Sequence, residues 1–218
     1  MVRLAFLLLP MAAWAADKPV IKYTPAATGD EAEERPVATR ISVDPLGSDF
    51  AVRVVFDRTP WGPDCKSRCA AMTLFLDTDD NPSTGLNLGK DAAETGADLA
   101  VVIQGVREFK EQSAEPGLKV KVRLLPSGTT SIEGGDWLSE MDLHHDAERV
   151  QSDGTSVYAL VDTTDPTIPS GKTIRVIYHP PGEKALTGKA KGMFLKSSGK
   201  IQVLGKKRGK EPSKRPAP

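Results

Sequence analysis

The sequence lacks an excess of charge of either sign, and it is poor in aromatic residues, in cysteine and in long apolar runs. Its 218 residues contain 29 Lys and Arg against 29 Asp and Glu, so the formal net charge is zero. This balance gives no general argument for nucleic-acid binding, and we expect no nucleic-acid partner. Sustained helical spacing of apolar residues is also missing. The chain is instead rich in turn residues, with 19 Gly and 17 Pro, which is typical of many short elements.

The N-terminal segment has the three parts of an export signal. Arg3 provides a positive charge, Leu4–Met11 is apolar, and Ala13–Ala15 (AWA) has small residues where a signal peptidase cleaves. The apolar run is far shorter than the ~20 residues that a membrane span needs. We therefore expect residues 1–15 to be a signal peptide and the mature chain to lack a membrane span. The protein is then exported, either periplasmic or secreted.

The rest of the chain divides by composition into three parts. Residues 16–37 are rich in proline and charge, which predicts a loose N-terminal lead-in. Residues 38–204 contain the strand-like patterns and are expected to form one β-sandwich domain. Residues 205–218 hold six basic residues and one acidic residue. Because such a segment cannot bury a core, we expect a disordered basic tail that either raises solubility or binds a polyanion.

Alternating apolar and polar residues indicate short strands along the domain. In Asp49–Phe56 the residues Phe50, Val52 and Val54 share one face. Leu99–Ile103 is apolar throughout, which predicts a strand buried on both faces. Further strands are expected at Thr73–Leu76, Lys119–Leu125, Trp137–Leu143, Val157–Val161, Thr173–Tyr178, Met193–Leu195 and Ile201–Leu204. The pattern predicts an all-β fold, an antiparallel β-sandwich of jelly-roll or immunoglobulin-like type with about eight to ten short strands.

An acidic loop lies between two of these predicted strands. Asp77, Asp79 and Asn81 place oxygen-bearing side chains at alternate positions, and Asp98 stands directly before the next strand. A tight loop can bring alternate side chains to one centre, and Ca²⁺ binds about six to eight oxygen ligands. We therefore predict that these four side chains bind calcium. The alternative is a solvated turn without a metal, because Asp, Asn, Pro and Gly are common turn residues.

The spacing of the acidic loop differs from that of an EF-hand. Counting from Asp77, the sixth position is Pro82, where an EF-hand requires glycine. The twelfth position is Leu88, where an EF-hand requires a bidentate glutamate. The loop contains no His or Cys, so its hard oxygen ligands favour calcium over a transition metal.

The stretch LFLDTDDNPSTG followed by TGADLAVVI resembles a motif of extracellular bacterial β-sandwich proteins. In that motif a strand leads into a D-x-D-x-[ND]-x-x-T-G loop, then a G-A-D triplet and a second strand. These proteins are similar in fold to family 9 carbohydrate-binding modules and DOMON-type domains. The matching residues are Asp77, Asp79, Asn81, Thr84, Gly85, Gly96, Ala97 and Asp98. Over residues 38–195 the resemblance implies a sandwich with a calcium-stabilised loop and a non-catalytic binding or accessory role.

The two cysteines, Cys65 and Cys69, are close together in a loop between predicted strands. In an exported protein, such a pair most often forms a structural disulfide. The alternative is a copper or redox site that uses the cysteines with His144, His145 or His179. The short segment between Cys69 and the next predicted strand leaves no room for the helix that thioredoxin-like copper chaperones place there.

Trp61 and Trp137 are the tryptophans that remain after the signal peptide, and they are candidate ligand-binding residues. The chain lacks the Gly-x-Ser-x-Gly elbow of serine hydrolases and a phosphate-binding glycine loop, and we expect no enzymatic activity. The sequence thus predicts a non-catalytic exported binding or accessory module. A carbohydrate-binding module and a copper or redox protein are the alternatives. The expected partner is an extracytoplasmic protein or a glycan of unknown identity.

Overall fold

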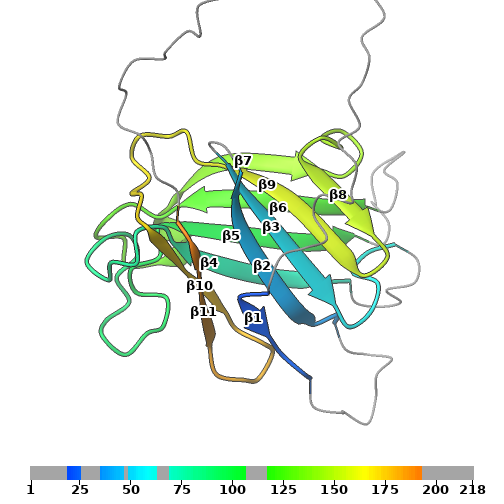
Figure 1. The fold of residues 1–218 in the computed structure, drawn as a ribbon, viewed down its shortest axis with the longest axis horizontal. Helices are drawn as coiled ribbons and strands as arrows, with labels where there is room; N and C mark the ends of the chain where they lie inside the picture. Colours follow the sequence, from blue (N-terminus) through cyan, green and yellow to red (C-terminus); the bar gives the residue numbers. More distant parts are fainter. Residues whose placement is uncertain (1–18, 26–34, 47–48, 63–68, 107–116, 193–218) are drawn as a thin grey trace, which may run out of the picture.

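The protein folds as two antiparallel β-sheets that face each other, which confirms the predicted all-β sandwich (Figure 1). The computed structural model describes residues 19–25, 35–46, 49–62, 69–106 and 117–192. Within these ranges, helical structure is limited to one short 3₁₀ turn, η3 (Ile132–Gly134). No helix in the described part of the chain is long and apolar enough to cross a membrane.

The two sheets contain five and six strands. The five-stranded sheet has the order β1-β2-β3-β9-β8, with β1 (Ile21–Lys22), β2 (Ala38–Leu46), β3 (Asp49–Phe56), β9 (Ser156–Asp162) and β8 (Val150–Asp153). The six-stranded sheet has the order β11-β10-β4-β5-β6-β7, with β11 (Leu186–Lys191), β10 (Thr173–Tyr178), β4 (Ala71–Asp77), β5 (Leu99–Val106), β6 (Gly117–Leu124) and β7 (Asp136–Asp142).

Strands with clear alternation lie where the sequence predicts them. The predicted bounds Asp49–Phe56 and Thr173–Tyr178 are those of β3 and β10. The five and six strands of the two sheets exceed the upper end of the predicted range of eight to ten by one. The two-residue strand β1 lies within the predicted lead-in. Met193–Leu195, Ile201–Leu204, the predicted signal peptide and the basic tail lie outside the described residues, so these expectations stay predictions.

The main core lies between the sheets and is formed by the inward side of each strand. Phe50, Val52 and Val54 of β3 are at most 2% exposed, as period-two alternation requires. Their counterparts on the six-stranded sheet, Leu74 and Val101, are fully buried. The hydrophobic effect therefore holds the two layers together through apolar faces that are encoded by alternation.

A second, smaller apolar cluster covers one end of the outer face of the six-stranded sheet. Phe75, Ala100 and Ile177 point outward from β4, β5 and β10, and the connecting loops cover them with Leu86, Ala97 and Leu125. The prediction of two buried faces for Leu99–Ile103 therefore holds only at the start of β5. Further along, Val102 is only half-buried and does not belong to this cluster.

Candidate metal centre

The acidic loop connects two neighbouring strands, which brings its two ends together. Asp77 is the last residue of β4, and Asp98 directly precedes β5. Leu76 pairs with Leu99 in the antiparallel ladder, and the Asp98 backbone N–H donates to the Leu76 carbonyl over 2.9 Å. Because Leu76 and Leu99 point into the core, the flanking aspartates point to the outer face, beneath the loop.

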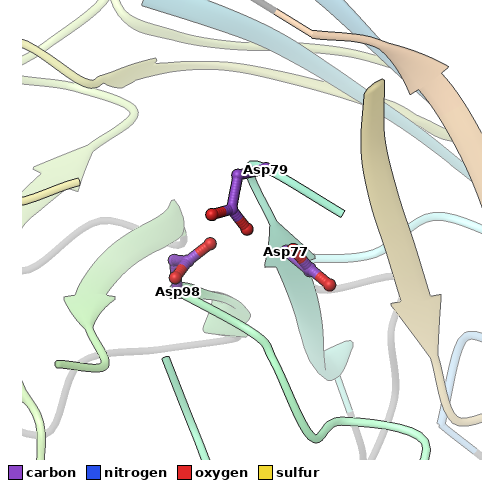
Figure 2. A group of neighbouring side chains, drawn as sticks. All are labelled: Asp77, Asp79 and Asp98. Atoms are coloured by element: carbon purple, nitrogen blue, oxygen red, sulfur yellow. The ribbon is translucent and has the colours of Figure 1, made fainter. Parts of the chain in front are cut away.

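Three carboxylates meet at this point, as the sequence predicts. One oxygen atom from each of Asp77, Asp79 and Asp98 lies within 4.8 Å of the others. The carboxylates of Asp79 and Asp98 point toward each other, with Asp77 beside them (Figure 2). Asp77 and Asp98 are 0% and 1% exposed, and Asp79 is half-buried. The group is compatible with a bound metal ion.

Asp98 has one satisfied oxygen and one that is not. Its Oδ2 accepts hydrogen bonds from the Thr78 backbone N–H and the Thr78 hydroxyl, both over 2.8 Å. Its Oδ1 is buried without a hydrogen-bond partner. Burial raises the pKa of Asp98 to about 7; the Thr78 hydrogen bonds lower it, and the charges of Asp79 and Asp77 raise it further. A buried oxygen without a partner is costly, and a cation beside it would remove that cost.

Asp77 is held from both sides. Its Oδ1 accepts the Asn81 backbone N–H over 3.0 Å, and its Oδ2 accepts Nε and Nη2 of Arg175 over 3.1 and 2.9 Å. Burial raises the pKa of Asp77, which the Asn81 N–H and Arg175 oppose. Arg175 therefore keeps one oxygen of Asp77 occupied, and it fixes the direction in which the carboxylate faces.

Asp79 and Asn81 shape the turn that follows β4. The Oδ1 of Asp79 accepts the Asn81 backbone N–H over 3.1 Å and the Thr84 hydroxyl over 3.0 Å. The side-chain oxygen of Asn81 accepts the Ser83 backbone N–H over 3.1 Å. Asn81 thus supports Asp77 and Asp79 through its backbone, and its role as a metal ligand stays a prediction.

Two glycines of the motif stand where a side chain would collide with backbone. A Cβ at Gly85 would lie 2.2 Å from the Ala97 carbonyl oxygen, and one at Gly96 would lie 2.7 Å from the Pro82 Cα. Both residues also have positive φ, +61° and +94°, which favours glycine. The T-G and G-A-D parts of the motif therefore let the two arms of the loop approach closely enough to carry the aspartates.

Arg175 is the residue of this site that the sequence does not reveal. It lies on β10, 98 residues from Asp77 in the sequence. It reaches the site because β10 pairs with β4 and places Arg175 directly opposite Asp77. Its Nη2 also donates to the Thr95 carbonyl, so it ties the loop to the sheet. Alternation in TIRVIY places Arg175 on the outer face, but nothing local shows which strand is its neighbour. Three ionised carboxylates and one guanidinium leave a net charge of two negative, which a divalent cation balances.

The other candidate residues lie elsewhere. Trp61 packs against the main core, its Nε1 donates to the Ser152 hydroxyl over 2.9 Å, and its ring meets His144 edge-on at 6.5 Å. Trp137 is 53% exposed at the start of β7, whereas His144 follows the end of that strand. The two tryptophans therefore lie toward opposite ends of β7, and their predicted role in ligand binding stays a prediction.

The predicted disulfide involves a residue outside the described part of the chain. Cys69 lies two residues before β4, and Cys65 falls within residues 63–68. The pairing of Cys65 with Cys69 stays a prediction, as does the alternative of copper or redox chemistry. Of the histidines, His179 pairs with Glu94 over 2.6 Å and His145 lies 3.4 Å from Asp142.

Comparison with known proteins gives no family assignment. No protein-family model matches the chain, and neither a curated protein nor a solved structure matches it. The similarity to family 9 carbohydrate-binding modules and DOMON-type domains therefore stays a resemblance based on the acidic motif. Function has to be argued from the site itself.

Proposed function

We propose that the protein is an exported, non-catalytic β-sandwich in which one calcium ion stabilises the loop between β4 and β5. The module acts in binding or in an accessory role at the cell envelope or outside the cell. The observation that carries the metal site is the buried Oδ1 of Asp98, which has no hydrogen-bond partner, in a carboxylate that faces the carboxylate of Asp79. Export is supported by the N-terminal sequence pattern.

The donor set favours calcium among common cations. All three side chains offer carboxylate oxygens, which are the hard ligands that Ca²⁺ prefers. Mg²⁺ demands stricter octahedral geometry and keeps several waters, which suits buried carboxylates less well. A zinc site would use Cys or His, and neither residue occurs in the loop.

Such an ion would act on the loop and not on a substrate. Asp77, Asp79 and Asp98 repel one another when ionised, and burial increases that repulsion. The ion would offset it and hold the two arms of the loop against β4 and β5. The expected gain is a rigid outer surface at one end of the six-stranded sheet.

A thermal melt tests the metal site. We compare the purified protein in excess Ca²⁺, in excess Mg²⁺ and in EDTA. A ligand that binds only the folded state adds about 2.7 kcal/mol at about 100 times its dissociation constant, so Ca²⁺ should raise Tm by several degrees. Mg²⁺ should raise it less.

Two variants decide whether the effect belongs to the predicted centre. Asp79→Asn keeps an oxygen that can accept the Asn81 and Thr84 hydrogen bonds but removes a charge, and it should abolish most of the Ca²⁺ shift. Asp91→Asn removes an exposed carboxylate of the same loop and should leave the shift unchanged. Identical melts in Ca²⁺ and EDTA would contradict the proposal.

A further inference from the structure

A mixed basic and aromatic surface lies on the outer face of the six-stranded sheet, apart from the metal centre. We call it the β6–β7 patch, and it consists of Lys119, Lys121 and Arg123 from β6 and Trp137 and Glu140 from β7. These residues share one face because Lys121 pairs with Glu140 and Arg123 pairs with Trp137 across the two strands. The alternate residues of β6, such as Val120 and Val122, point into the core.

Trp137 is the most exposed large hydrophobic side chain in the described part of the chain. The residue is 53% exposed although it lies on a sheet face next to a well-packed sandwich. The guanidinium carbon of Arg123 lies 4.0 Å from the ring centroid, and Lys121 Nζ lies 5.6 Å from it. These cation–π contacts fix the plane of the ring. An exposed and oriented tryptophan is a feature of binding surfaces.

Lys119, Lys121 and Arg123 outnumber the two carboxylates on this face, which are Glu140 and Asp142 opposite Lys119. Glu140 lies 3.4 Å from Lys119 and 2.9 Å from Lys121, so it partly neutralises this pair. Arg123 has no carboxylate partner within the described residues. Its Nη1 donates to the Ile132 carbonyl over 2.7 Å, and its buried Nε has no hydrogen-bond partner. The patch therefore presents the Arg123 guanidinium beside the Trp137 ring. It also presents Lys121, whose ion pair with Glu140 a competing anion can displace.

We infer that the β6–β7 patch binds an acidic polysaccharide, with a sugar ring stacked on Trp137 and its carboxylate or sulfate group held by Lys121 and Arg123. The flat indole suits the apolar C–H face of a saturated sugar ring, and the cations select for negative charge. Carboxylate and sulfate share this recognition chemistry. The inference deepens the proposed binding role and rests on it, but it uses none of the metal-site residues.

Binding is measured by isothermal titration calorimetry with the full-length purified protein. The probes are hexagalacturonate, a sulfated dextran oligomer, neutral cellohexaose and oligoglutamate. We expect one or both acidic glycans to bind with an affinity that falls as salt rises, and cellohexaose to bind more weakly. Trp137→Ala should weaken glycan binding by up to about tenfold, because the stacking surface is lost. Lys121→Ala should weaken it several-fold, whereas Lys191→Ala, an exposed lysine on β11, should not.

Glu140→Gln distinguishes recognition of the glycan's negative charge by Lys121 from non-specific sugar binding. The substitution removes the ion pair that holds Lys121, so affinity for the acidic glycan should rise several-fold while cellohexaose binding stays the same. The inference is overturned if neither acidic glycan binds, if cellohexaose binds as tightly, or if oligoglutamate binds equally and Trp137→Ala has no effect. The titration repeated with Asp79→Asn shows whether the patch and the metal centre succeed or fail independently.

Discussion

At the scale of single residues, the two oxygens of Asp98 have opposite surroundings. Oδ2 accepts two hydrogen bonds from Thr78, whereas Oδ1 is buried without a partner. The ionised carboxyl is therefore held in place but incompletely stabilised. A proton or a metal ion would each satisfy it, so the two should compete for the same site.

This competition gives a pH dependence in the metal-free protein. Burial raises the pKa of Asp98 from its usual 3.8 to about 7, so between these values the folded state binds this proton more tightly than the unfolded state does. Stability from this group is therefore fully present below about pH 4 and is lost as pH rises through about 7. We expect a lower Tm in EDTA at pH 8 than at pH 5, and Asp98→Asn should reduce that difference.

The same measurement in saturating Ca²⁺ provides the control. A bound cation stabilises the ionised form, so the loss of Tm between pH 5 and pH 8 should largely disappear in the wild type. Asp142 and Asp162 have lowered pKa values, so the stability they contribute is lost as pH falls below about 4. Their titration therefore lies below the range of this experiment. If the wild type and Asp98→Asn lose the same amount of Tm between pH 5 and pH 8 in EDTA, Asp98 does not titrate in this range.

At the scale of elements, the loop between β4 and β5 is tied to β10 by Arg175. The guanidinium donates to the buried Asp77 carboxylate and to the Thr95 carbonyl. Removing one member of a buried ion pair leaves an uncompensated charge, so Arg175→Met should lower the free energy of unfolding by about 3 kcal/mol in EDTA. The loss should be smaller in Ca²⁺, because the ion would then neutralise Asp77. Urea denaturation measures both values.

Lys189→Met is the matched control for this prediction. Lys189 also connects the loop to a neighbouring strand, with Nζ 2.5 Å from Asp80 Oδ2, but its side chain is 63% exposed. An exposed ion pair contributes less than about 1 kcal/mol, so this variant should be nearly neutral. Equal losses for the two variants would mean that burial of Asp77 does not set the strength of the Arg175 contact.

The contrast between local and distant pairing explains what the sequence could predict. Asp77 and Asp98 come together because β4 and β5 are consecutive strands, so the hairpin itself closes the site. Strand alternation likewise predicts β3 and β10 residue by residue. Arg175 could not be assigned, because the sequence does not say that β10 pairs with β4. The separate surroundings of Trp61 and Trp137 depend on the same long-range packing.

At the scale of the whole molecule, the six-stranded sheet supports two apolar clusters on opposite faces. Its inner face packs on the other sheet, and its outer face carries the small cluster that includes Phe75, Leu86 and Ile177. β4, β5 and β10 contribute side chains to both clusters, one from each face of the sheet. The loop is therefore a packed part of the fold, and a change that loosens it should affect global stability and metal binding together.

Leu86 offers a test of this coupling, with Leu88 as its control in the same loop. Leu86 is 0% exposed within the outer cluster, whereas Leu88 is 39% exposed. Leu86→Ala should lower the free energy of unfolding by about 2–5 kcal/mol through the cavity it leaves, and Leu88→Ala by less than about 0.5 kcal/mol. Leu86 also bonds through its backbone to Gly96 and Ala97, next to Asp98, so its truncation should weaken Ca²⁺ binding as well. Urea denaturation in EDTA and calcium titration measure the two effects. A destabilised Leu86→Ala protein with unchanged calcium affinity would show that the outer cluster supports the sheet without positioning the aspartates.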